Sequence, residues 1–189
     1  MTYSLNLELS LLLIQQGTRP CTNERERVHK ELKRMEALGI IVMEERTSQW
    51  VSSMVTVTKS ESDRVRICLD PKDLNNMIER QHYPMKTIGE VTLRLPNAKL
   101  FSTLDANCRF WQLELDAESS ELCTFNSPFG RYRYTRLPFG ISSAPEIFQR
   151  TMSQVFEDIE VVEVIMNDIL AWGNKEQHDK SLTMVLKRA

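Results

Sequence analysis

The sequence has few of the features that mark a secreted, zinc-binding or membrane-spanning chain. Its 189 residues include only four cysteines, which stand far apart with no C-x-x-C pair, and three histidines that do not cluster near them. This spacing fits neither a zinc site nor a disulfide framework and predicts reduced thiols in an intracellular protein. The only candidate targeting segment, residues 5–14, contains Glu8, lacks a basic start and is too short to span a bilayer. We therefore expect no membrane partner, and place the protein in the cytoplasm or nucleus by default.

An excess of charge of one sign is also missing. The chain has 24 Lys and Arg against 26 Asp and Glu, a net charge of -2, and 41% apolar residues. This balance is typical of a globular protein with a real core, and by itself it does not indicate a nucleic-acid partner. No Gly/Ser/Pro linker, repeat or low-complexity tract interrupts the sequence, so we expect no flexible internal boundary.

Helical spacing of apolar residues appears in four segments. The first, residues 23–39, has an Asn that can cap its start and a Gly that can close its end. A short helix is predicted for residues 87–95, and a C-terminal one for residues 178–188. Between them, Ser143 and Glu146 have the spacing of a capping box that opens a helix with one apolar face.

Alternating apolar and polar residues predict strands between these helices. The predicted strands are residues 49–59, 64–70, 99–105, 110–116 and 131–136, followed by a hairpin with the arms "VEVI" and "ILAW". Strands and helices are interleaved without a strict βαβ alternation, which favours an α+β fold.

Carboxylates at the ends of two apolar strands are the strongest chemical feature. Asp105 ends one strand, and Asp168 follows Asn167 in the tight turn of the last hairpin. If these strands are neighbours in one sheet, the two carboxylates converge, as two Mg²⁺ ions require for nucleotidyl transfer. Asn and Asp are also favoured in hairpin turns, so spacing alone leaves a plain turn as the commoner interpretation.

Several longer segments, in order, resemble a known family from about Thr18 onwards. They include "VRICLDPKDLNNMI", "LRLPNAKLFSTLDA", "RYRYTRLPFGISSAPEIFQRTM" and "VIMNDILAWG". Together they resemble the fingers and palm of the reverse transcriptase of gypsy-like LTR retrotransposons. The resemblance implies an α+β right-hand polymerase palm with an antiparallel sheet and a fingers subdomain. It also implies that residues 18–189 are a reverse transcriptase fragment, with interleaved fingers and palm and no thumb, after a divergent leader at residues 1–17.

The resemblance further implies an RNA-directed DNA polymerase that acts on an RNA or DNA primer-template with dNTPs. Asp105 and Asp168 match catalytic aspartates that hold two Mg²⁺ ions, and Asn167 stands where the family has another aspartate. Other positions match nucleotide-binding residues: Phe110 below the sugar, Arg66 with Lys59 or Arg64 at the triphosphate, and Phe139 and Gly140 near the nucleotide and template. Each of these positions also has a structural interpretation: Phe110 as part of the core, the three basic residues as surface charge, and Phe139 with Gly140 as part of a plain loop.

Two departures from the family pattern fall where the chemistry is most demanding. Asn167 brings no charge, and one unit-charge pair at about 4 Å near a protein surface contributes roughly 4 kcal/mol. Because about 1.4 kcal/mol is tenfold in rate, we expect a loss on the order of a thousandfold. Arg109 also replaces a small residue of the family. The alternatives are a non-catalytic nucleic-acid-binding remnant, using the fingers hairpin and "RYRYTR", and a decayed element or assembly module of a retroelement polyprotein.

Overall fold

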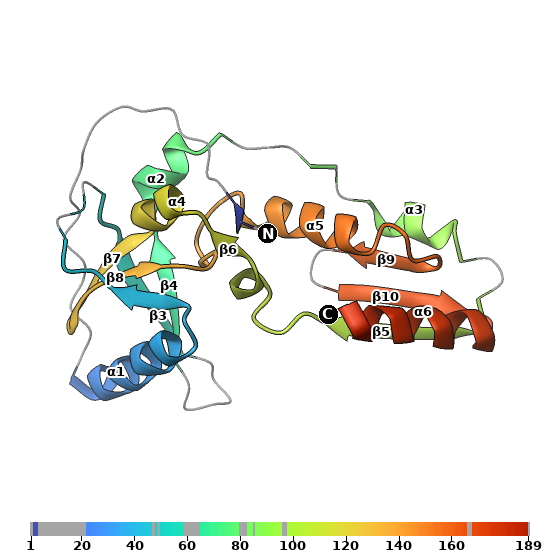
Figure 1. Cartoon of the computed structure of the whole chain (residues 1–189), viewed down its shortest axis with the longest axis horizontal. Coiled ribbons are helices and arrows are strands. Elements are labelled where there is room, and N and C mark those ends of the chain that lie inside the picture. Colours follow the sequence, from blue (N-terminus) through green and yellow to red (C-terminus); the bar gives the residue numbers. More distant parts are fainter. Residues whose placement is uncertain are drawn as a thin grey trace. The chain divides into compact units, whose positions relative to one another are not determined.

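The structure is a computed structural model that describes residues 2–3, 22–46, 48, 50–58, 65–79, 83–84, 86–95, 98–165 and 168–188 (Figure 1). The chain divides into two compact units. The first unit consists of residues 1–80 and 110–144, and the second consists of residues 81–109 and 145–189. Each unit is therefore formed by two separate segments of the chain.

The helices of the first unit begin with the long helix α1. Its helices are α1 (Thr22–Ala37), α2 (Lys72–Met77) and α4 (Ala117–Leu122), together with all but the first residue of the 3₁₀ turn η1 (Arg109–Gln112). α1 buries Val28, Leu32 and Met35 on one face, at the predicted helical spacing. Gly39 has a φ of +66° and the Ile40 N–H donates to the Met35 carbonyl, which closes the helix as predicted. The helix begins at Thr22, so the predicted cap at Asn23 is wrong.

The strands of the first unit form small antiparallel sheets and one short parallel pair. Its strands are β1 (Thr2–Tyr3), β2 (Ile41–Met43), β3 (Ser53–Thr58), β4 (Val65–Asp70), β6 (Glu114–Leu115), β7 (Thr124–Ser127) and β8 (Gly130–Tyr134). β3 pairs with β4 as the predicted hairpin, β2, β8 and β7 form one sheet in that order, and β1 pairs with β6. In the core of this unit, Phe125 stacks on Tyr132 and packs at a tilt against Tyr134.

The prediction of a strand over residues 110–116 is wrong for most of its length. Only Glu114 and Leu115 are in a strand, whereas Phe110 to Gln112 belong to η1. Phe110 and Leu113 are both buried, and the Leu113 N–H donates to the Phe110 carbonyl at 3.1 Å. Because a 3₁₀ turn aligns residues three apart, it buries this pair on one side, whereas a strand would place them on opposite faces.

The second unit is a three-stranded antiparallel sheet with helices packed against it. Its elements are α3 (Ile88–Thr92), β5 (Leu100–Asp105), α5 (Ala144–Val155), β9 (Val162–Ile165), β10 (Asp168–Gly173) and α6 (Lys175–Arg188). The strand order is β5-β10-β9, so the predicted hairpin of β9 and β10 is confirmed, and β10 is the central strand. None of the helices in the described residues is long and apolar enough to cross a bilayer.

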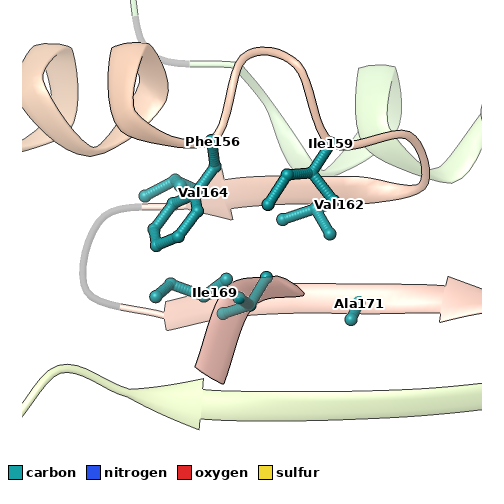
Figure 2. Close-up of a cluster of buried hydrophobic side chains, with 7 residues drawn as sticks. Phe156, Ile159, Val162, Val164, Ile169 and Ala171 are labelled. Atoms are coloured by element: carbon teal, nitrogen blue, oxygen red, sulfur yellow. The ribbon is translucent and has the colours of Figure 1, made fainter. Parts of the chain in front are cut away.

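One apolar cluster holds the sheet of the second unit against its helices. Figure 2 shows its side chains from the strands β9 and β10 and from the segment after α5. The cluster consists of Phe156, Ile159, Val162, Val164, Ile169, Ala171 and Val185. This packing covers one face of the β9-β10 hairpin. The residues of β9 and β10 that alternate with the cluster residues have their side chains on the opposite face.

The helix starts in the second unit differ from the predictions. The predicted capping box is wrong, because Ser143 Oγ and Glu146 Oε2 are each buried without a hydrogen-bond partner. Pro145 lies between them and has no N–H to offer a capping hydroxyl. α6 begins three residues before its predicted start, because the Gln177 N–H donates to Asn174 Oδ1 at 3.0 Å and so caps the helix there.

Candidate active site

Asp105 and Asp168 lie directly opposite each other in the sheet of the second unit. They are paired residues of the neighbouring strands β5 and β10, and both are exposed. Opposed residues of an antiparallel pair have Cα atoms about 4.5–5.5 Å apart and side chains on the same face. The expectation that the two strands are neighbours is therefore confirmed, and their register places the two aspartates on the same face.

The position of Asp168 within the hairpin differs from the prediction. Asp168 is the first residue of β10 and pairs with Ile165 of β9 as well as with Asp105, so it belongs to the sheet rather than to the turn. Its backbone is fixed by strands on both sides. Asn167 lies outside the described residues.

The two carboxylates supply the kind of ligand that hard divalent cations prefer. Mg²⁺ is commonly bound through one or two carboxylates, with water and substrate phosphates completing its shell. The described part of the chain contains no group of three or more His, Cys, Asp or Glu side chains that could hold a metal ion. Asp105 and Asp168 therefore fit part of a metal site whose other ligands come from solvent, substrate or an undescribed residue.

Three of the predicted nucleotide-binding residues lie together in the first unit. The Arg66 guanidinium is 5.3 Å from the centre of the Phe139 ring, which in turn lies 4.9 Å from the centre of the Phe110 ring. Arg66 is exposed, whereas Phe110 is only 4% exposed. The cation is therefore available to a ligand, while most of the Phe110 side chain is used in packing.

The group that Gly140 approaches closely is the backbone of β4. Its φ is +113°, and a Cβ at this position would lie 2.0 Å from the Leu69 carbonyl oxygen. Its own carbonyl accepts a hydrogen bond from Asn75 Nδ2 at 2.9 Å. Glycine is thus required here by the backbone of β4, which is a structural reason independent of any nucleotide.

The remaining predicted positions differ in how far the structure describes them. Lys59 and Arg64 lie outside the described residues. Arg109 is half-buried at the start of η1 and follows Cys108, whose φ of +50° is unusual for a residue other than glycine.

The segment "RYRYTR" does not form the predicted stacking surface. Tyr132 is 4% exposed and Tyr134 is fully buried, so neither ring is available to a nucleic-acid base. Arg131 donates to the Arg46 carbonyl, and Arg133 forms an ion pair with Glu44 at 2.8 Å. The alternating pattern was correct for a strand, but the aromatic face points into the core.

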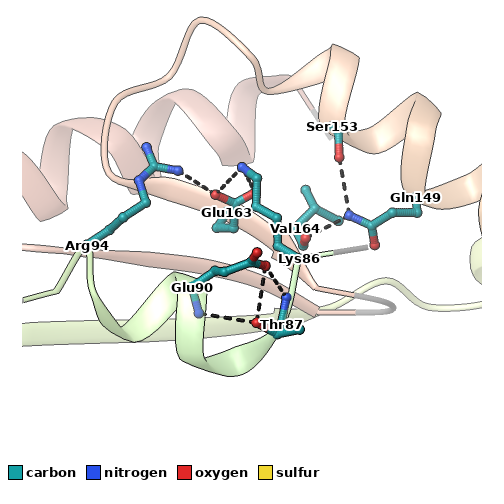
Figure 3. A network of polar contacts seen from close by, with 8 residues as sticks. All are labelled: Lys86, Thr87, Glu90, Arg94, Gln149, Ser153, Glu163 and Val164. Carbon is teal, nitrogen blue, oxygen red and sulfur yellow. Dashed lines mark hydrogen bonds and ion pairs between the residues drawn. The ribbon is translucent and has the colours of Figure 1, made fainter. Parts of the chain in front are cut away.

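A charged group that the sequence reasoning missed lies on β9. Glu163 is only 8% exposed and forms ion pairs with Lys86 and Arg94 (Figure 3). A single acidic residue inside the apolar run "VVEVI" was the available signal, because a buried carboxylate requires a partner. A pocket of about 480 Å³ is lined by this group together with Gln149 and neighbouring residues.

Residues 57–189 match the family described as "Reverse transcriptase (RNA-dependent DNA polymerase)". The chain belongs to this reverse transcriptase family. It is 35% identical over 152 residues to the Retrovirus-related Pol polyprotein from transposon 412 of Drosophila melanogaster. The aligned region covers 76% of this chain and 12% of that polyprotein. The chain is 30% identical over 170 residues to the Enzymatic polyprotein of cauliflower mosaic virus (strain Strasbourg), covering 87% of this chain and 25% of that one.

Solved structures confirm the fold of this reverse transcriptase chain. Native prototype foamy virus protease-reverse transcriptase has a TM-score of 0.83 at 19% identity, covering 99% of this chain and 25% of that one. A foamy viral protease-reverse transcriptase in complex with an RNA/DNA hybrid has a TM-score of 0.84, with the same identity and coverage. The expected α+β fold of fingers and palm is thus confirmed. This chain spans an eighth to a quarter of the length of these relatives.

Proposed function

We propose that the chain is the fingers-and-palm part of an RNA-directed DNA polymerase of a gypsy-like LTR retrotransposon. The proposed reaction is two-metal nucleotidyl transfer on an RNA or DNA primer-template. The observation that carries it is the pairing of Asp105 with Asp168 across neighbouring strands, with both carboxylates exposed on one face. Family membership and the similarity to a transposon Pol polyprotein support the retroelement origin.

In this proposal each residue has a role that its chemistry allows. Asp105 and Asp168 hold divalent cations, which when bound activate the primer 3′-hydroxyl and stabilise the leaving pyrophosphate. Arg66 binds the triphosphate, since its exposed guanidinium can donate to two phosphate oxygens at once. Phe139 supports Arg66 from below through its ring face, and Phe110 supports Phe139.

We further propose that catalysis by the chain as it stands is impaired. Asn167 offers a neutral carbonyl oxygen where the family pattern has a carboxylate. The missing charge corresponds to roughly 4 kcal/mol at about 4 Å, or on the order of a thousandfold in rate. Arg109 adds bulk four residues after Asp105, where the family has a small residue.

Primer extension with Mg²⁺ or Mn²⁺ tests this function. The chain and its Asn167→Asp variant are compared, with Asp105→Asn in the variant background as the inactive control. We expect extension by Asn167→Asp, little by the unmodified chain and none by the control. Extension by the control would exclude the proposed metal pair, and robust extension by the unmodified chain would contradict the impairment.

A further inference from the structure

Glu163 is the buried charge of the sheet that carries the two aspartates. It lies on the edge strand β9, two residues before Ile165, and pairs with Leu170 of β10. Because side chains alternate along a strand, Glu163 lies on the same face as Asp168, on the neighbouring strand. A strand rises about 3.3 Å per residue, so Glu163 is about two such steps from the end of the sheet that carries Asp168.

Two cations from one segment hold the Glu163 carboxylate. Lys86 Nζ donates to both of its oxygens, at 2.7 and 2.8 Å, and Arg94 donates to Oε2 at 2.6 Å (Figure 3). The side chains of the two cations are about half exposed, whereas that of Glu163 is 8% exposed. The guanidinium of Arg94 also lies 5.9 Å from the centre of the Trp172 ring, on β10. The segment is thus bound to two strands of the sheet.

The helix between these cations has a defined start. Thr87 and Glu90 form a capping box: the Thr87 N–H donates to Glu90 Oε2 at 2.7 Å, and the Glu90 N–H donates to Thr87 Oγ1 at 3.3 Å. The hydrogen bonds that Glu90 Oε2 accepts from the Thr87 N–H and from Thr87 Oγ1 lower the pKa of the Glu90 carboxyl. Glu90 is therefore used within α3, and Lys86 and Arg94 flank the helix with Glu163 as their shared partner.

The open edge of β9 is also held by a side chain of α5. Gln149 of α5 is 3% exposed, and its Nε2 donates to the Val164 carbonyl at 2.7 Å and to Ser153 Oγ at 3.2 Å. An edge carbonyl that would otherwise lack a partner is therefore satisfied by a side chain. β9 is fixed at two adjacent residues, one through its side chain and one through its backbone.

We propose that Glu163 is a positioning residue that aligns Asp168 with Asp105 for metal binding. The inference rests on the proposed function. Asp168, the first residue of β10, pairs with β9 on one side and with Asp105 of β5 on the other. The position of β9 therefore affects how Asp168 lies relative to Asp105. Two cations with overlapping carboxylate ligands tolerate little error in the separation of those carboxylates. Glu163 does not itself bind the metal, because both of its oxygens accept hydrogen bonds from Lys86 and Arg94.

Manganese binding, measured by electron paramagnetic resonance on the full chain carrying Asn167→Asp, tests this proposal without requiring activity. Glu163→Gln should weaken Mn²⁺ binding about tenfold, as loss of groups that orient metal ligands does elsewhere. Asp158→Asn is the matched control: it removes one acidic charge of the same unit from an exposed ion pair with Arg188. We expect this control to change Mn²⁺ affinity by less than about twofold.

Lys86→Gln separates positioning from simple electrostatics. If only electrostatics mattered, removing the positive charge of Lys86 should tighten Mn²⁺ binding. If Glu163 positions β9, loss of its ion pair with Lys86 should loosen that strand and weaken Mn²⁺ binding. We expect weaker binding, by at least about twofold. Because Lys86 is half exposed, this variant also serves if Glu163→Gln does not fold, as judged by its thermal melting. Tighter binding by Lys86→Gln, or equal effects of Glu163→Gln and Asp158→Asn, would overturn the proposal.

One further variant distinguishes failure of this inference from failure of the proposed function. Asp105→Asn should abolish Mn²⁺ binding, leaving the signal of free Mn²⁺ at full intensity, if the metal binds at the aspartate pair. If Asp105→Asn has no effect, the proposed metal site and the positioning role are both wrong. If Asp105→Asn abolishes binding but the variants of Glu163 and Lys86 behave like the control, only the positioning role is wrong.

Discussion

Replacement of Gly140 by alanine is the most direct structural perturbation of the first unit. A Cβ at this position would lie 2.0 Å from the Leu69 carbonyl oxygen and 3.0 Å from its carbonyl carbon. Both atoms belong to the backbone of β4, so they cannot swing aside as the end of a side chain can. The φ of +113° is a second obstacle, because residues other than glycine rarely adopt it.

The expected cost follows from these contacts. A residue held in such a backbone region costs about 1–3 kcal/mol. Moving the chain away from β4 also strains two hydrogen bonds, from Leu69 N–H to the Phe139 carbonyl and from Asn75 to the Gly140 carbonyl. Each contributes about 0.5–1.5 kcal/mol. We therefore expect Gly140→Ala to lower the free energy of unfolding by about 3–5 kcal/mol, a large part of the 5–15 kcal/mol typical of a domain.

Urea unfolding followed by circular dichroism measures this difference. Gly130→Ala is the matched control, because Gly130 has a similar φ of +129° but its Cβ would meet only Met43 Cε, at 4.0 Å. The control should lose about 1–2 kcal/mol from backbone strain alone. A loss below about 1 kcal/mol for Gly140→Ala, or equal losses for both variants, would refute the argument that the β4 backbone dictates this glycine.

Three further predictions concern pH, strain and nucleotide binding. Burial raises the pKa of the Cys123 thiol and of the Tyr134 hydroxyl, so the stabilisation from keeping both groups neutral is complete below about pH 9 and is lost as the pH rises above it. The urea concentration at the unfolding midpoint should therefore fall between about pH 9 and about pH 11, and less steeply in Cys123→Ala. A midpoint that stays constant over this range would contradict the prediction. Cys108→Asn should raise the free energy of unfolding by about 0.5–1 kcal/mol, because Cys108 is exposed at a φ of +50°, which asparagine tolerates better; a loss in urea unfolding would contradict this. In the Asn167→Asp background, Arg66→Ala should raise the KM for dNTP about tenfold in steady-state extension, and an unchanged KM would remove Arg66 from the nucleotide site.

Regular periodicity made most of the fold predictable. The hairpins of β3 with β4 and of β9 with β10, and helix α1, follow from alternating or helical apolar residues with turn signals at their ends. The prediction of a strand over residues 110–116 was wrong because this sequence fits two structures. It has the two-residue period of a strand, and it also fits a 3₁₀ turn that buries residues three apart. Only the burial of both Phe110 and Leu113 decides between them, and that burial depends on tertiary packing.

The candidate site was predictable only as far as family motifs extend. The opposition of Asp105 and Asp168 follows from two strands whose ends carry carboxylates, once those strands are neighbours. The resemblance could not show why Gly140 is a glycine, since the carbonyl it approaches lies 71 positions earlier, at Leu69. Nor did it indicate Glu163, whose partners come from a segment about 70 to 80 residues earlier in the chain.

The rate of single-nucleotide primer extension, measured side by side for the unmodified chain and Asn167→Asp, tests the central claim most directly. If Asp105 and Asp168 form a metal site that lacks one carboxylate, Asn167→Asp should be faster on the order of a thousandfold. Asp168→Asn in the same background should return the rate to the level of the control without enzyme. Equal rates for the unmodified chain and Asn167→Asp would contradict the account, as would undiminished extension by the Asp168→Asn variant.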